Sequence, residues 1–117
     1  MDLYELVKIQ KEFDNDHGWT IGGNNDIELL NNIKEDMIGL VGEIGELSNI
    51  LKKITLELNA GRSVIEFDKY EQMKEEAIDS FIYLIRIMSH LDMDIESEYI
   101  KKLDINKKRF RKFIIGR

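Results

Sequence analysis

Two short stretches of the sequence place carboxylates three residues apart. The first stretch pairs Glu43 with Glu46, and the second pairs Glu76 with Asp79. Residues three apart lie on the same face of an α-helix. Core-forming residues flank both pairs, and like charges repel one another more strongly where water is excluded. If the two helices are antiparallel neighbours, the four carboxylates converge on one small volume.

A hard divalent cation would remove the repulsion among these carboxylates. Mg²⁺ takes oxygen ligands and is often shared with the phosphates of a substrate. The chain has no Cys and only two His, and neither acid pair contains a His. We therefore expect Mg²⁺, with Mn²⁺ as the alternative, rather than zinc or iron. A di-iron bundle would usually need Glu-x-x-His pairs. The competing interpretation is that these are ordinary surface acids on amphipathic helices.

Three glycines recur at every third position beside the first acid pair: Gly39, Gly42 and Gly45. A glycine inside a helix costs about 1 kcal/mol relative to alanine. Two explanations are open at this point. Either a neighbouring helix packs closely against these glycines, or they leave clearance for a ligand next to Glu43 and Glu46.

The apolar periodicity predicts four helices, at residues 3–13, 27–58, 69–91 and 95–113. The chain contains no Pro, and Ile, Leu, Glu and Lys dominate its composition, which favours helices. We expect residues 1–117 to form one all-α domain, an antiparallel four-helix bundle completed as a homodimer or homotetramer. A glycine-rich loop at residues 17–25 carries Trp19, and Asn25 or Asp26 is expected to cap the next helix. His90 is expected to face solvent or the C-terminal dipole of its helix.

The charge of the chain is unevenly distributed. The net charge is −6, yet residues 101–117 are rich in Lys and Arg and contain one acid, Asp104. This basic end is either a nucleic-acid-binding tail or the phosphate-binding half of a site whose acids hold a metal. No run of about 18 apolar residues predicts a membrane span. The N-terminal segment also lacks the pattern of a signal peptide, so we expect a cytoplasmic protein.

Three motifs in order resemble the MazG-like, all-α NTP pyrophosphohydrolases, and in particular their dCTP-pyrophosphatase-like branch. The signature of that family is an ExxE pair, an ExxD pair and a downstream basic KxxxN/R element. Here the motifs are Leu-Val-Gly-Glu-Ile-Gly-Glu-Leu at 40–47, Glu-Ala-Ile-Asp at 76–79 and Lys-Leu-Asp-Ile-Asn-Lys-Lys-Arg-Phe at 102–110. The resemblance covers about residues 36–113. Gly42 replaces the first acid of the fuller EExxE form, and the loop after Trp19 is longer than in that branch.

The resemblance implies Mg²⁺-dependent hydrolysis of a nucleoside triphosphate to its monophosphate and diphosphate, without a membrane or nucleic-acid partner. It implies that the metal ligands are Glu43, Glu46, Glu76 and Asp79. Either Glu43 or Glu46 would be the catalytic base. It implies substrate contacts from Lys53, Lys102, Asn106, Arg109, Tyr83 and Trp19, the first four for phosphates or sugar and the two aromatics for the base. Lys102, Asn106 and Arg109 also share one helix face by their spacing.

Two other functions are compatible with the same sequence. One is a non-enzymatic, helical, oligomeric binding module whose basic C-terminal tail contacts nucleic acid. This alternative explains residues 101–117 but leaves the acid pairs without a role. The other is a catalytically inactive member of the family that only assembles.

Overall fold

The chain folds into four α-helices, as its apolar periodicity predicts. A computed structural model describes residues 1–61 and 65–116. Its elements are α1 (Leu3–Asp16), α2 (Asp26–Asn59), α3 (Phe67–His90), α4 (Ile95–Arg109) and a short 3₁₀ turn, η1 (Arg111–Phe113). No strand occurs within the described ranges. The all-α fold class is therefore confirmed, with helix boundaries close to the predicted ones.

The helix α2 forms the long axis of the molecule. It has 34 residues, which at 1.5 Å per residue is about 50 Å of helix. The longest dimension of the molecule is 55 Å. Asn25 caps this helix, because its side chain accepts a hydrogen bond of 2.9 Å from the backbone N–H of Glu28. Of the two capping residues considered from the sequence, Asn25 is thus the one used.

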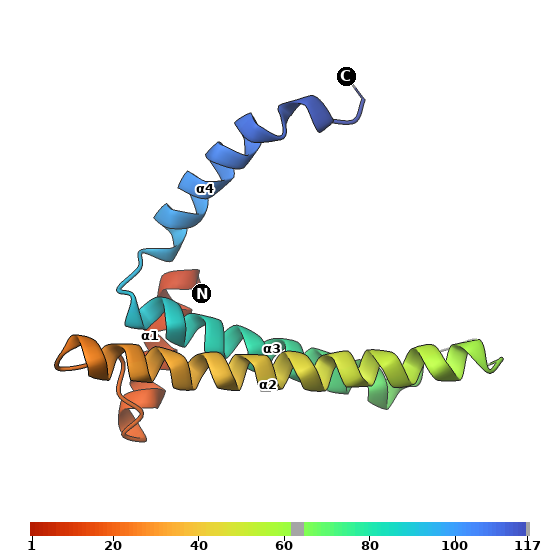
Figure 1. Cartoon of the computed structure of the whole chain (residues 1–117), viewed down its shortest axis with the longest axis horizontal. Coiled ribbons are helices and arrows are strands. Elements are labelled where there is room, and N and C mark those ends of the chain that lie inside the picture. Colours follow the sequence, from red (N-terminus) through yellow and green to blue (C-terminus); the bar gives the residue numbers. More distant parts are fainter. Residues whose placement is uncertain (62–64, 117) are drawn as a thin grey trace.

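The helices α2 and α3 run antiparallel side by side, and α1 crosses the pair near the start of α2 (Figure 1). Within the described ranges, the buried apolar side chains are few: Leu40 and Ile54 from α2, and Ile85 from α3. The core is therefore only a thin layer between two long helices. This pairing brings the middle of α2, with its acid pair, next to the first half of α3.

The helix α4 projects away from the pair (Figure 1). It follows a tight turn in which Asp92 has a φ of 52°, and it is capped by Asp94, which accepts a hydrogen bond from the backbone N–H of Ser97. No residue of α4 is buried. The chain therefore does not close a four-helix bundle by itself, and completion by a second copy stays a prediction.

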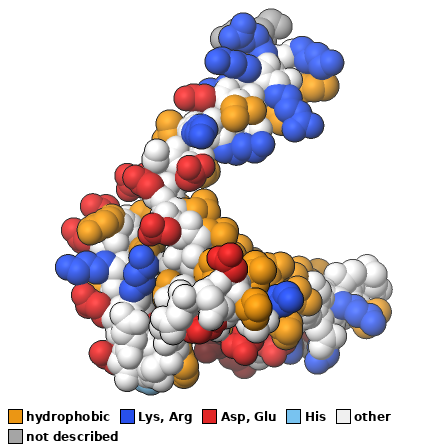
Figure 2. Space-filling view, turned by 60° about the vertical axis from the view of Figure 1, so that its left-hand side comes forward, with side chains coloured by type: hydrophobic (Ala, Val, Ile, Leu, Met, Phe, Trp, Pro, Cys, Tyr) orange, Lys and Arg blue, Asp and Glu red, His pale blue; other side chains and the backbone are white. Residues whose placement is uncertain are grey.

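Large apolar side chains remain exposed along the helix pair. Ile38 and Val41 of α2 are 73% and 64% exposed, and Ile78 of α3 is 58% exposed. The radius of gyration is 18.5 Å, whereas a compact chain of this length has about 13 Å. Figure 2 shows Lys and Arg side chains gathered on the projecting arm, well apart from many of the acids. None of the described helices is long and apolar enough to cross a membrane.

Candidate functional site

Three of the four predicted acids meet between α2 and α3. Glu43 and Glu46 from α2 and Glu76 from α3 each place a carboxylate oxygen within 4.8 Å of the others. The antiparallel pairing of the helices causes this, since it turns the two acid-bearing faces toward each other. Asp79, three residues after Glu76, is not among the described carboxylates that approach this closely. It lines the adjoining pocket together with Glu43.

The acid cluster, defined as Glu43, Glu46 and Glu76, is strained electrostatically. The Oε2 atoms of Glu43 and Glu76 are buried and have no hydrogen-bond donor in the described part of the chain. A proton on Glu76 could donate to Glu43. This hydrogen bond, together with burial and the nearby Glu46 carboxylate, raises the pKa of Glu76 to about 8. This raised pKa favours a proton on Glu76 at neutral pH when no metal is bound, and the buried carboxylate oxygens are ligands of the kind that a hard divalent ion takes.

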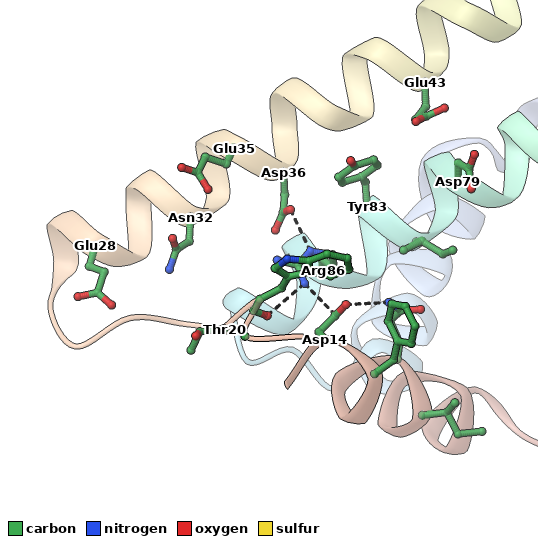
Figure 3. A pocket seen from close by; sticks show the side chains of 16 residues that line it. Asp14, Thr20, Glu28, Asn32, Glu35, Asp36, Glu43, Asp79, Tyr83 and Arg86 are labelled. Atoms are coloured by element: carbon green, nitrogen blue, oxygen red, sulfur yellow. Dashed lines mark hydrogen bonds and ion pairs between the residues drawn. The ribbon is translucent and has the colours of Figure 1, made fainter. Parts of the chain in front are cut away.

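A pocket of about 960 Å³ adjoins the acid cluster (Figure 3). It begins at Glu43 and Asp79 and continues along α2, with α1 and the loop after it on the other side. Its lining contains the aromatic residues Phe13, Trp19 and Tyr83. This volume is at the upper end of the range of small-molecule sites. A ligand in the pocket would thus have aromatic surfaces along it, carboxylates at the Glu43 and Asp79 end, and further carboxylates along the rest of the pocket, from Asp14, Glu28, Glu35 and Asp36.

Tyr83 lies against α2 because residue 39 is a glycine. A Cβ added to Gly39 would lie 2.4 Å from the Tyr83 ring, which is closer than atoms can approach. The ring therefore occupies the space between Asp36 and Glu43 on the pocket side of α2 (Figure 3). A Cβ added to Gly42 or Gly45 would meet nothing within 4 Å. Close packing thus explains Gly39, whereas the other two glycines border open space.

Trp19 lines the same pocket, from the loop between α1 and α2. It is 53% exposed. Its ring stacks on His17 with a centroid distance of 4.9 Å, and its contact with Phe13 is edge-on at 5.9 Å. The structure therefore places both predicted base-stacking residues, Trp19 and Tyr83, along one pocket.

The predicted phosphate-binding residues are elsewhere in this chain. Lys53, Lys102, Asn106 and Arg109 do not line the pocket. The last three belong to α4, which extends away from the acid cluster (Figure 1). Arg109 lies 4.9 Å from the centroid of the Phe110 ring of its own chain. A single chain therefore separates the acidic half of the predicted site from its basic half.

Sequence reasoning missed a largely buried polar network, three of whose four residues line the pocket: Asp14, Asp36 and Arg86. It joins Asp14 of α1, Asp36 of α2, and Arg86 and His90 of α3. The expectation that His90 faces solvent is wrong: its side chain is 0% exposed and lies 2.6 Å from Asp36. Helical spacing contained a signal, because Asp36 precedes Glu43 by seven residues and Arg86 follows Asp79 by seven. Each of the two therefore shares a helix face with a predicted site residue.

Arg86 lies at the centre of this network (Figure 3). Its Nη1 is 2.8 Å from Asp14 Oδ2, and its Nε donates to Asp36 Oδ1 at 2.9 Å. Burial by itself would lower the pKa of the Arg86 guanidinium, but the bond to Asp36 and the charges of both acids raise it overall. The guanidinium is therefore charged at every physiological pH, and the two buried acids share its single positive charge.

These features define a class of protein: an all-α chain with a carboxylate cluster and an aromatic pocket between two antiparallel helices. A comparison with known protein families finds no match. The chain is similar to human dCTP pyrophosphatase 1, with 24% identity over 108 residues, which is 92% of this chain. It spans 58% of the length of that protein. The similarity points to the MazG-like NTP pyrophosphohydrolase superfamily, whose motifs the sequence resembles.

Proposed function

We propose that this protein is a Mg²⁺-dependent nucleoside triphosphate pyrophosphohydrolase, which converts an NTP or dNTP and water into the monophosphate and diphosphate. The observation that carries the proposal is the convergence of Glu43, Glu46 and Glu76 at one end of a nucleotide-sized pocket. The similarity to human dCTP pyrophosphatase 1 supports the same reaction class and makes dCTP one of the first substrates to test.

In this proposal the acid cluster holds the metal. Glu43, Glu46 and Glu76 are the ligands, and Asp79 joins them from the pocket wall. Mg²⁺ held by these residues would supply positive charge against the triphosphate and Lewis acidity for the reaction. The orphaned Oε2 atoms of Glu43 and Glu76 support this, because each is buried without a hydrogen-bond donor in the described ranges.

The side chains of the pocket position the nucleotide. Tyr83 and Trp19, which both line the pocket, offer aromatic faces to the base. Glu43 or Glu46 accepts the proton from the water that attacks the α-phosphorus, and the bond to the bridging oxygen breaks to release diphosphate. Water ends as the new oxygen of the monophosphate. Most of the rate enhancement in such a site comes from positioning and charge.

We propose that a second copy of the chain completes the site. The leaving diphosphate needs positive charge, and Lys102, Asn106 and Arg109 share a face of α4 that does not reach its own acid cluster. The exposed apolar residues of α2 and α3, among them Ile38, Val41 and Ile78, offer a surface for such a copy. Lys53, on the same helix as Glu46, would approach the phosphates from the other side.

The direct test is release of diphosphate, measured by a malachite-green assay with added inorganic pyrophosphatase. We expect Mg²⁺-dependent signal from nucleoside triphosphates and almost none without the added pyrophosphatase. Replacing Glu46 or Asp79 by Ala should lower kcat at least about a hundredfold while circular dichroism stays unchanged. Glu75→Ala is the matched control, because Glu75 is an exposed acid next to Glu76. Wild-type rates in the Glu46 and Asp79 variants, or metal-independent binding of nucleic acid alone, would contradict the proposal.

A further inference from the structure

The loop between α1 and α2 is held by side chains to which the proposed reaction assigns no chemical step, and two of them, Asn32 and Arg86, also line the pocket. Arg86 Nη1 points at the backbone oxygen of Trp19 at 3.4 Å. The backbone N–H of Gly22 donates to His90 Nδ1 at 2.8 Å. The backbone oxygen of Gly22 accepts from Asn32 Nδ2 at 2.7 Å. Long-range bonds from α2 and α3 thus reach both Trp19 and Gly22.

The groups that hold the loop are themselves fixed by burial and charge. Asp36 is the link: one of its oxygens accepts from Arg86 Nε at 2.9 Å, and the other lies 2.6 Å from His90 Nε2. The side chain of His90 is 0% exposed and that of Asp36 is 7% exposed. Moving any of these groups would leave a buried charge or a buried donor unpaired, which is costly.

The hydrogen bonds also determine which nitrogen of His90 carries the proton. Gly22 N–H is a donor, so Nδ1 must be the acceptor and carries no hydrogen. Nε2 then carries the single proton and donates it to Asp36. This neutral form is the one that can bond to the loop and to Asp36 at the same time.

We propose that Arg86, Asp36 and His90 form a clamp that fixes residues 19–22 as one wall of the nucleotide pocket, with His90 acting as a positioning residue in its Nε2–H form. The proposed function enters this inference only in naming the ligand as a nucleotide. Because Trp19 lines the pocket and its backbone belongs to the clamped segment, the clamp sets where that aromatic wall stands. It therefore governs the affinity for nucleotide, whereas the acid cluster governs the chemical step.

Two substitutions at His90 separate the clamp from simple packing. Asn places its side-chain oxygen near the position of Nδ1, so His90→Asn keeps an acceptor for Gly22 but loses the bond to Asp36. Gln places its amide nitrogen near the position of Nε2, so His90→Gln keeps a donor to Asp36 but loses the acceptor for Gly22. Both variants remove the same imidazole ring, and each is the other's control.

The readout is the fluorescence of Trp19, which is the sole tryptophan of the chain. We expect acrylamide to quench Trp19 more strongly in His90→Gln, which loses the bond to the loop, than in His90→Asn, which keeps it. With nucleotide and Mg²⁺, His90→Gln should raise KM about fivefold, the worth of one hydrogen bond, with kcat unchanged. Equal quenching and equal KM in the two variants, or a loss of kcat alone, would overturn the clamp.

A measurement on the unmodified protein does not depend on the folding of the variants. The ¹⁵N chemical shifts of the His90 ring should show an unprotonated Nδ1 and a protonated Nε2 at neutral pH. A proton on Nδ1 would rule out the bond to Gly22 and with it the clamp. If the wild type hydrolyses no nucleotide, the proposed function fails, while the quenching and NMR results still decide on the clamp.

Discussion

At the scale of single residues, Glu76 links the pH, the metal and the stability of the fold. Its carboxyl group faces Glu43 and Glu46. The hydrogen bond that its protonated form can donate to Glu43, together with burial, raises the pKa of Glu76 to about 8. The unfolded chain, in contrast, releases this proton near the ordinary pKa of a glutamate, about 4.3. Without metal, the folded protein thus binds more protons than the unfolded chain between these two pH values.

This difference gives the pH dependence of stability a definite sign. A group whose pKa is raised by folding stabilises the fold at low pH and loses that contribution as the pH rises through its folded-state value. We expect the Tm of the metal-free protein to fall between about pH 5 and pH 8.5. Glu76→Gln should flatten this fall, since glutamine does not titrate. A Tm that rises over the same range, in a thermal-melt series, would contradict the raised pKa.

The same proton should be exchanged for the metal. At pH 7 binding of Mg²⁺ should release about one proton per ion from the acid cluster, because carboxylate ligands must be ionised. Calorimetric titrations in two buffers of different ionisation enthalpy measure this release directly. Binding without proton release would mean that the ion sits elsewhere.

At the scale of elements, two glycines of α2 differ in their surroundings, and only one of them lies against α3. Gly39 lies against the Tyr83 ring, whereas Gly42, three residues later on the same helix, faces open space. Replacing each glycine by Ala should therefore change the free energy of unfolding in opposite directions. Both gain helix propensity, but only one meets a neighbouring side chain.

We expect Gly39→Ala to destabilise the protein by about 1–3 kcal/mol, as overpacking does. Gly42→Ala should stabilise it by up to about 1 kcal/mol, because alanine is the better helix former. Urea denaturation of the two variants and the wild type measures both changes. If the two variants were destabilised equally, the approach of Tyr83 would not be what requires Gly39.

At the scale of the whole molecule, the projecting α4 separates the basic and acidic parts of the chain (Figures 1 and 2). A chain with a radius of gyration of 18.5 Å and exposed apolar helix faces has unused contact surface. If a second copy supplies α4 to the acid cluster, each site needs the acids of one chain and Arg109 of the other.

Mixing two inactive variants tests this sharing. Glu46→Ala and Arg109→Ala should each be nearly inactive alone. In mixed dimers one site would combine an intact acid cluster with an intact α4, so random pairing should restore about a quarter of the wild-type activity. Light scattering should give a mass at least twice that of the 13.8 kDa chain. A monomeric protein, or no recovery after mixing through the unfolded state, would show that α4 does not act across copies.

The sequence by itself determined where the helices lie and which face of each helix carries the acidic residues. Helical periodicity is a local property, so the stripes of α2 and α3, the cap at Asn25 and the pairing of Glu43 with Glu46 follow from residues close in the chain. The approach of Glu76 to those acids needed one further assumption, that consecutive helices pack antiparallel, and that assumption was right.

Only the tertiary structure decided where α4 points and what surrounds His90. The direction of α4 depends on a turn around Asp92 and on a weakly covered apolar face, which local patterns do not encode. His90 is buried because α2 and the loop at Gly22 both meet the last turn of α3. Those partners are 54 and 68 residues away in sequence, and long-range contacts of this kind arise only when the whole chain folds.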